Sequence, residues 1–243
     1  MAIGRVKWVQ SPERVSSYRS YQNPKGSTVM TYQMSKRIGW GIMTLLALGI
    51  VLVASRYFSG NPDVFFPEQR DVYLAHRAGI LMHILGGVLA LGLGPFQFLT
   101  TLRTRRPTVH RWIGRFYLVG ILLGGVAGLF MAFYAYAGIS ASLGFASLAI
   151  LWLTTGFMAY RTIRAGDTAA HRRWMIRNFA LTFAAVTLRL ESMPLSMLFG
   201  QTTGYDIVAW SCWIPNLLIA EGIVRGWLRR QQRQTPLTAG TAS

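Results

Sequence analysis

The residues of this chain that could carry chemistry are a few ionisable side chains inside or beside long apolar segments. An arginine in an apolar membrane segment costs at least about 2.5 kcal/mol at the centre unless it pairs, reaches water or lines a wet cavity, so Arg189 marks a candidate site. His83 lies at a similar expected depth, in a stripe of small residues at helical spacing. We therefore expect an outer-half polar pocket formed by His76, His83, Arg189 and Glu191, with Glu191 as the ion-pair partner of Arg189.

A second candidate site is expected at the opposite, inner face. His110-Arg111 and His171-Arg172 each begin an apolar segment that enters from this face. Arginine and histidine side chains bind phosphate and carboxylate oxygens through charge-assisted hydrogen bonds. The pattern therefore predicts an inner-face site for an anion, either a lipid phosphate or a haem propionate.

A polar stripe runs along the fifth apolar segment and is expected to face the interior of a helical bundle. Beside it, Arg177 lies at a depth similar to that of Glu221 in the sixth segment, so we expect a buried ion pair of Arg177 and Glu221 with Asn178 next to it. The members of the stripe follow three-and-four spacing: His171, Asn178, Thr182, Ala185 and Arg189.

Three glycines in the third apolar segment predict close helix packing. Gly120, Gly124 and Gly128 recur every four residues and therefore lie on one face of a helix. Small residues at this spacing let a neighbouring backbone approach closely. We interpret them as a helix contact and not as a cofactor site.

These residues must be positioned by membrane-spanning helices. Of the 243 residues, 52% are apolar and only 14% are charged, whereas about 25% are charged in an average soluble domain. An apolar stretch of about 20 residues crosses the hydrocarbon core as a helix. The sequence predicts an all-α polytopic membrane protein, a bundle of six transmembrane helices at residues 38–58, 78–102, 112–136, 143–160, 174–199 and 205–228.

The distribution of charge predicts the orientation of these helices. The chain carries 25 Lys and Arg against 8 Asp and Glu, for a net charge of +17. Nearly all basic residues fall in segments on one side if six spans alternate; only Arg56, Arg70 and Arg77 flank the other. The positive-inside rule then places both termini in the cytoplasm. We expect these basic clusters to contact anionic lipid headgroups, not nucleic acid, in a multi-pass protein of the bacterial inner membrane.

The predicted membrane domain covers residues 34–230. It is preceded by a polar, basic arm of residues 1–33, expected to be poorly ordered, and followed by a disordered tail of residues 231–243. The single cysteine, Cys212, lies in the sixth apolar segment. Neither an intramolecular disulfide nor a metal site is therefore expected.

Four sequence runs resemble a bacterial family of predicted membrane proteins, known as the domain of unknown function number twenty-three hundred and six. The likeness covers roughly residues 40–228 and rests on HILGGVLALGLGPFQF (83–98), HRWIGRFYL (110–118), HRRWMIRNFALTFAAVTLRL (171–190) and WSCWIPNLLIAE (210–221). It implies an integral membrane protein but carries over no activity.

A weaker likeness to transmembrane b-type cytochromes makes haem b an alternative cofactor. Such haems lie between two imidazoles. His76 and His83 are about 10 Å apart on one helix and cannot both ligate one haem. His110 and His171 begin two helices on the same side and could do so, but their place at the water interface favours headgroup contact.

Three functional classes remain open from the sequence. The favoured one is a non-catalytic membrane subunit or an assembly or accessory factor within a membrane complex, because the charged residues can be explained structurally. The second is a haem-binding or quinone-linked redox protein. The third is a membrane enzyme or small-molecule transporter with an outward-facing polar pocket around His83, Arg189 and Glu191.

Overall fold

The computed structural model describes residues 24–234, and every regular element in that range is a helix. Helix α1 (Pro24–Ser55) includes residues 24–33, which the sequence analysis assigned to the arm; the expectations for residues 1–23 and 235–243 lie outside the described residues. The chain divides after Gly41 into two units, and the features described below belong to the larger one, from residue 42 onward. The all-α fold class is confirmed.

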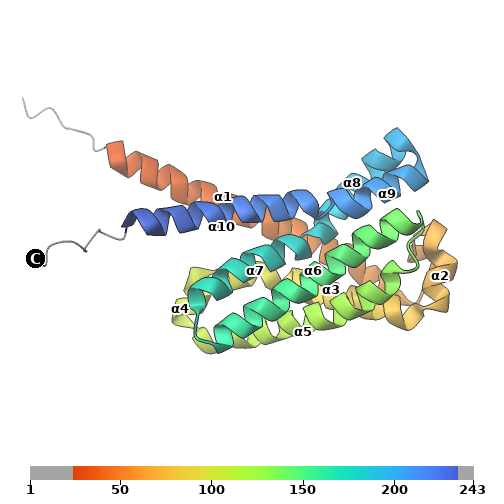
Figure 1. Cartoon of the computed structure of the whole chain (residues 1–243), viewed down its shortest axis with the longest axis horizontal. Coiled ribbons are helices and arrows are strands. Elements are labelled where there is room, and N and C mark those ends of the chain that lie inside the picture. Colours follow the sequence, from red (N-terminus) through yellow and green to blue (C-terminus); the bar gives the residue numbers. More distant parts are fainter. Residues whose placement is uncertain (1–23, 235–243) are drawn as a thin grey trace, which may run out of the picture. The chain divides into compact units, whose positions relative to one another are not determined.

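Short helical turns follow α1 and lead into the longer helices (Figure 1). The turns are η1 (Arg56–Ser59), η2 (Pro62–Val64), η3 (Pro67–Gln69) and α2 (Arg70–Ala75). The remaining helices are α3 (Arg77–Gln97), α4 (Thr100–Arg105), α5 (Pro107–Ala132), α6 (Ile139–Arg164), α7 (Thr168–Thr182), α8 (Ala184–Phe199), α9 (Gln201–Ser211) and α10 (Ile214–Gln234).

Five stretches of the described chain are long and apolar enough to cross a membrane, by length and composition. They are Arg37–Ser59, Arg77–Gln97, Pro107–Ala132, Ile139–Arg164 and Gln201–Arg229. The predicted span at residues 174–199 is not among them because it is divided between α7 and α8, of 15 and 16 residues. α9 and α10 together make up the last stretch.

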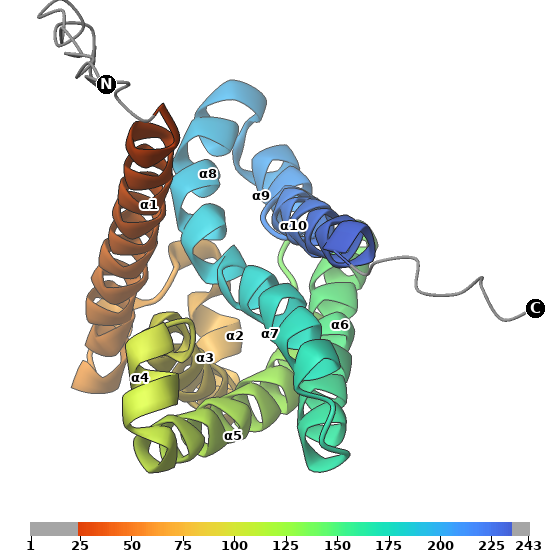
Figure 2. The same cartoon turned by 90° about the vertical axis from the view of Figure 1, so that its left-hand side faces the viewer.

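The chain changes direction between α7 and α8 at Phe183, next to Thr182 (Figure 2). Thr182 Oγ1 donates to the Asn178 carbonyl oxygen of the preceding turn at 3.0 Å, whereas Thr187 Oγ1, which follows the bend, has the Cys212 carbonyl oxygen as its closest acceptor. Such bonds to the preceding turn compete with the backbone ladder and bend helices. Beyond the bend, the face of α8 that carries Ala185 and Arg189 is turned toward the cavity described below.

Helices α3, α5, α6 and α7 pack in sequence around the core, with α3 against α5, α5 against α6 and α6 against α7 (Figures 1 and 2). The tightest approach joins α3 to α5 through glycine. A Cβ atom on Gly86 would lie 2.2 Å from the Gly124 nitrogen and 2.4 Å from the Gly120 oxygen. The glycines of α5 thus allow the two backbones to touch, as their spacing suggested.

The segment between α1 and α3 covers one end of the bundle. Gly60 has a φ of 80°, in the left-handed region that favours glycine. The side chain of Asn61 accepts a hydrogen bond from the Asp63 N–H at 2.9 Å, and Pro62 begins the next turn. Asp63 also pairs with Arg70 at 3.3 Å. These contacts fix the residues that face the candidate site, Phe66, Gln69 and Tyr73.

A substitution at the α3–α5 contact tests this packing. We expect Gly86→Ala to lower the free energy of unfolding by about 1–3 kcal/mol, because its methyl group meets backbone atoms that cannot move aside. The matched control is Gly87→Ala, which meets nothing within 4 Å and should be neutral or stabilising. Thermal unfolding of both variants in the same detergent measures the difference. Equal stability would show that the two backbones are farther apart than described.

Candidate functional site

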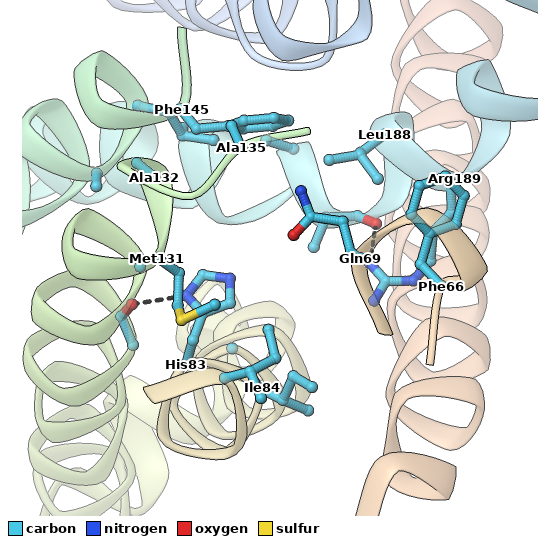
Figure 3. A pocket seen from close by; sticks show the side chains of 18 of the residues that line it. Phe66, Gln69, His83, Ile84, Met131, Ala132, Ala135, Phe145, Leu188 and Arg189 are labelled. Carbon is cyan, nitrogen blue, oxygen red and sulfur yellow. Dashed lines mark hydrogen bonds between the residues drawn. The ribbon is translucent and has the colours of Figure 1, made fainter. Parts of the chain in front are cut away.

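A cavity of about 460 Å³ lies between α3, α5, α6, α7 and α8, beneath the segment that joins α1 to α3 (Figure 3). Most of its lining is apolar, from residues such as Ile80, Phe145, Leu148 and Leu181. Its polar lining residues come from seven helices or helical turns: Tyr57, Gln69, Tyr73, His83, Thr182, Arg189, Ser192, Ser196 and Tyr205. Arg189 is the only lining residue with a formal charge when histidine is neutral.

His83 is held in a fixed orientation by α5. Its Nδ1 lies 2.8 Å from the Gly124 carbonyl oxygen, and a Cβ atom on Gly128 would lie 2.6 Å from the same nitrogen. The ring therefore fits only because residue 128 is glycine. A carbonyl oxygen only accepts hydrogen bonds, so Nδ1 carries the proton. The other ring nitrogen, Nε2, faces the cavity as an acceptor in the neutral ring (Figure 3).

Arg189 reaches the cavity from α8 and has no carboxylate partner among the residues that the structure describes. Its Nη1 donates to the Ala185 carbonyl oxygen at 2.9 Å, within its own helix. The expected pair with Glu191 is not formed, because residues two apart on a helix point in different directions. Glu191 does not line the cavity and instead accepts a hydrogen bond from the Ser211 hydroxyl of α9 at 2.6 Å.

Tyrosines line the cavity together with Arg189. Tyr57 and Tyr73 are its electrostatic neighbours. Burial, with smaller contributions from Tyr205 and Tyr57, raises the pKa of Tyr73, so its hydroxyl stays protonated and able to donate at neutral pH. Gln69 also lines this end, where its side-chain nitrogen donates to the Tyr134 carbonyl oxygen at 3.1 Å. Sequence reasoning missed the tyrosines, which lie far apart along the chain.

His76 does not belong to the cavity, contrary to the sequence-based expectation. Its ring centroid lies 4.1 Å from that of Tyr134 and 5.5 Å from that of Phe130. It ends the short helix α2 and precedes the first turn of α3, so it packs on aromatic residues at the end of α5. The expected group of four residues is thus reduced to His83 and Arg189.

A buried polar network on α7 supports the floor of the cavity. Asn178 is fully buried; it accepts from the Tyr117 hydroxyl at 2.7 Å and donates to the Trp152 carbonyl oxygen at 2.8 Å. Thr182 accepts from Trp152 Nε1 at 2.8 Å. Trp152 and Thr182 line the cavity, so this network fixes them between α5, α6 and α7.

The structure pairs Arg177 of α7 with Glu221 of α10. The carboxylate accepts from Arg177 Nε and also from Nη2, the latter at 3.0 Å. The guanidinium carbon lies 4.8 Å from the centre of the Trp174 ring. Asn178 does not join this pair, since consecutive residues on a helix point in different directions, and its amide serves the buried network instead.

The expected inner-face site is assembled only in part. His171, Arg103 and Arg111 are electrostatic neighbours of His110, whose Nδ1 is buried without a hydrogen-bond partner among the described residues. His171 Nδ1 lies 2.8 Å from the Ala159 carbonyl oxygen. Arg172, by contrast, lies over the Trp227 ring of α10 at 5.3 Å.

The placement of the histidines bears on the haem alternative. Of the four, only His83 lines the large cavity, so this cavity does not offer the two imidazoles of a bis-histidine haem site. Within residues 24–234, no three His, Cys, Asp or Glu side chains lie together in a way that could hold a metal ion. The cavity presents mainly donors to a ligand: guanidinium, phenol and amide N–H or O–H groups.

Comparison with known proteins gives one match. The model of a protein family described as "Predicted membrane protein (DUF2306)" matches residues 80–224, which include His83, Arg189, Arg177 and Glu221. Neither the curated proteins nor the solved structures contain a significant match.

The Arg177–Glu221 pair can be tested by a double-mutant cycle. We expect Arg177→Met or Glu221→Met alone to destabilise the protein by about 1.5–3 kcal/mol, because each leaves a charge without its partner. The double variant should cost less than the sum of the two. Arg229→Met, at an exposed position of the same helix as Glu221, should change stability by no more than about 0.5 kcal/mol. Additive effects in chemical unfolding would contradict the pairing.

Proposed function

Since this chain belongs to the DUF2306 family of predicted membrane proteins, we propose that it is a multi-pass membrane protein that binds an acidic, mostly apolar small molecule in the cavity between His83 and Arg189. The observation that carries the proposal is the state of Arg189. Its guanidinium faces the cavity and, within residues 24–234, has no carboxylate partner and is bonded only to a carbonyl oxygen of its own helix. No Asp or Glu is among the residues that line the cavity.

An anionic ligand group would complete this site electrostatically. A half-buried arginine without a counter-ion loses hydration and gains no opposite charge in exchange, so a carboxylate or similar group bound there forms strong, charge-assisted hydrogen bonds. Tyr57 and Tyr73 supply further donors beside it. His83 Nε2 can accept a proton or a hydrogen bond at the opposite wall. The apolar remainder of the cavity suits a hydrocarbon body.

This proposal differs from the role that the sequence favoured. In a non-catalytic subunit or accessory factor, each half-buried charge is expected to pair with an opposite charge of the same chain, as Arg177 and Glu221 do. Arg189 is not satisfied in that way, which supports the small-molecule class instead. A redox protein with a bis-histidine haem is disfavoured by the single imidazole in the cavity.

We also propose six membrane crossings, with both termini in the cytoplasm of a bacterial cell. The chain reverses at Gly166 between α6 and α7 and again at Gly200 between α8 and α9, both at positive φ. α7 and α8 together therefore lead from one end of the bundle to the other, which supports a crossing broken at Phe183. The basic residues of the α6–α7 turn and of α10 mark the cytoplasmic end.

The inner face is proposed to hold anionic lipid headgroups. Arg103 and Arg111 lie beside His110, and Arg172 and Arg173 lie over the ring of Trp227. Each basic residue near an anionic surface contributes about 1 kcal/mol to attraction. We propose lipid headgroups and not nucleic acid as the partner because these arginines lie at the ends of membrane-spanning helices.

The topology is tested by cysteine labelling in a Cys212→Ala background, where a single cysteine is introduced at an exposed position. An impermeant maleimide added to intact cells should label Gln201→Cys but neither Ala165→Cys nor Gln232→Cys. Permeabilised cells, in which all three should react, provide the control. If Ala165→Cys and Gln201→Cys were both labelled in intact cells, α7 and α8 would not form a crossing.

The ligand proposal is tested with decanoate and its uncharged analogue decanol. In lipid nanodiscs, wild-type protein should bind radiolabelled decanoate above empty discs, and decanol should not compete. Arg189→Gln should weaken binding by about 10- to 100-fold, the loss expected for a charged hydrogen bond. Arg56→Gln removes an equal charge at an exposed position near the same end and should bind as the wild type does. Equal binding by the two variants would overturn the proposal.

A further inference from the structure

A second, smaller cavity of about 70 Å³ adjoins the first and reaches α1. Five of its ten lining residues also line the large cavity. These shared residues include His83 and Arg189, and they place the junction between the two cavities at the candidate site. The shared set is His83, Ile84, Gly87, Ala185 and Arg189.

The smaller cavity is called the side cleft below. Apart from the five shared residues, its lining is entirely aliphatic. Three residues come from α1 and two from α3: Ile50, Val51, Ala54, Val88 and Leu91. On α1, Leu52 directly follows Val51 in the sequence and is 72% exposed, on the helix surface that would face lipid. The cleft therefore leads from Arg189 along apolar side chains toward the bilayer side of α1.

Packing next to the cleft holds α1 in place without filling it. Ala47 of α1, Leu91 of α3 and Val186 of α8 form a buried apolar cluster, with Val51 and Phe183 against it. Val51 also lies close to Gly92, where an added Cβ atom would meet its methyl carbon at 3.7 Å. This is an ordinary van der Waals distance to a side chain, whereas α3 and α5 meet backbone to backbone, so the α1 wall of the cavity can yield more easily than the α3–α5 wall.

Aromatic rings cover the cavity at the end formed by residues 56–76. Phe66 stacks on Tyr205 with ring centroids 6.0 Å apart, and Tyr136 packs edge-on against both at 6.5 and 5.7 Å. Gln69 is tied to the Tyr134 carbonyl oxygen beneath them. This end presents ring faces and a fixed amide, whereas the side cleft presents flexible aliphatic side chains.

From this arrangement we propose that the ligand is a membrane-dissolved acid with a single hydrocarbon chain, such as a fatty acid, and that it enters from the bilayer through the cleft between α1, α3 and α8. The inference rests on the proposed function of the cavity. The acid group stops at the junction, held by Arg189 with Tyr57 and Tyr73, and the chain extends into the large cavity toward Phe145 and Trp152.

The chemistry of the route selects this class of ligand. A water-soluble anion would have to pass an aliphatic cleft that offers no hydrogen bond, and it would leave the apolar lining of the large cavity uncovered. A two-chain phospholipid has one chain too many for a cleft with so little free space. A single-chain acid is already dissolved in the bilayer beside α1, and its charge is matched by the one cation at the junction.

The experiment follows entry through quenching of the cavity-lining Trp152 by a nitroxide-labelled stearic acid, in nanodiscs mixed by stopped flow. The labelled methyl ester, which lacks the charge, supplies the background from tryptophans that face lipid. Two variants narrow the cleft from different helices, Val51→Phe on α1 and Val88→Phe on α3. Their controls, Leu52→Phe and Leu85→Phe, add the same ring at exposed positions of the same helices.

We expect both cleft variants to slow the acid-specific quenching roughly tenfold. The added ring raises the barrier to entry through the cleft, and a tenfold slower rate corresponds to the lower end of the cost of overpacking. The two controls should match the wild type, and Trp152→Phe should remove the acid-specific phase. Because the two cleft variants lie on different helices, misfolding of one leaves the other as a test. Decanoate binding at equilibrium should persist in a folded cleft variant.

The outcomes separate the two proposals. Acid-specific quenching that is equally fast in cleft variants and controls would overturn lateral entry and leave the anion site of Arg189 standing. Absence of any acid-specific phase in the wild type, together with Arg189-independent decanoate binding, would overturn both. Equal competition by a two-chain phosphatidic acid would overturn the single-chain class.

Discussion

The contact between the backbones of α3 and α5 is the constraint on which the candidate site depends. Gly86 meets Gly120 and Gly124 so closely that no side chain fits between the helices. Within that contact, the Gly124 carbonyl oxygen also binds His83, and the absence of a side chain at Gly128 makes room for the imidazole ring. One helix contact therefore sets both the wall of the cavity and the direction of its histidine.

The second requirement is the bend between α7 and α8. A straight helix would carry Arg189 along the line set by Asn178 and Thr182, which are fully committed to the buried network. The bend at Phe183 lets α7 keep those bonds while α8 leans away to pack on α9. Space opens between α8 and α3, and Arg189 faces it. Asn178 and Thr182 on α7 thus have hydrogen-bond partners within the buried network, whereas Arg189 on α8 has no counter-ion among the described residues.

This division also explains why the two half-buried arginines of the region, Arg177 and Arg189, have different roles. Arg177 binds Glu221 of α10 and stacks on Trp174, so its cost of burial is offset by the fold itself. Arg189 lies beside Tyr57 and Tyr73, whose hydroxyls can donate hydrogen bonds, and the part of the chain that the structure describes supplies no anion to it. A group from outside the chain would have to supply it, which is the physical basis for assigning the cavity to an acidic ligand.

The sequence by itself determined the helical class, the approximate positions of the apolar segments, the glycine face of α5 and the family. Each depends on local periodicity or composition, which the one-dimensional sequence carries directly. It also indicated His83 and Arg189 as neighbours at similar depth, because depth follows from position along a helix. It misjudged Glu191 and His76, since depth does not specify the direction of a side chain around the helix.

Only the tertiary structure placed Tyr57, Tyr73 and Tyr205 around the cavity and left Arg189 without a carboxylate partner among the described residues. These features arise from the packing of segments far apart in the chain, and from a bend at Phe183 that neither proline nor glycine marks.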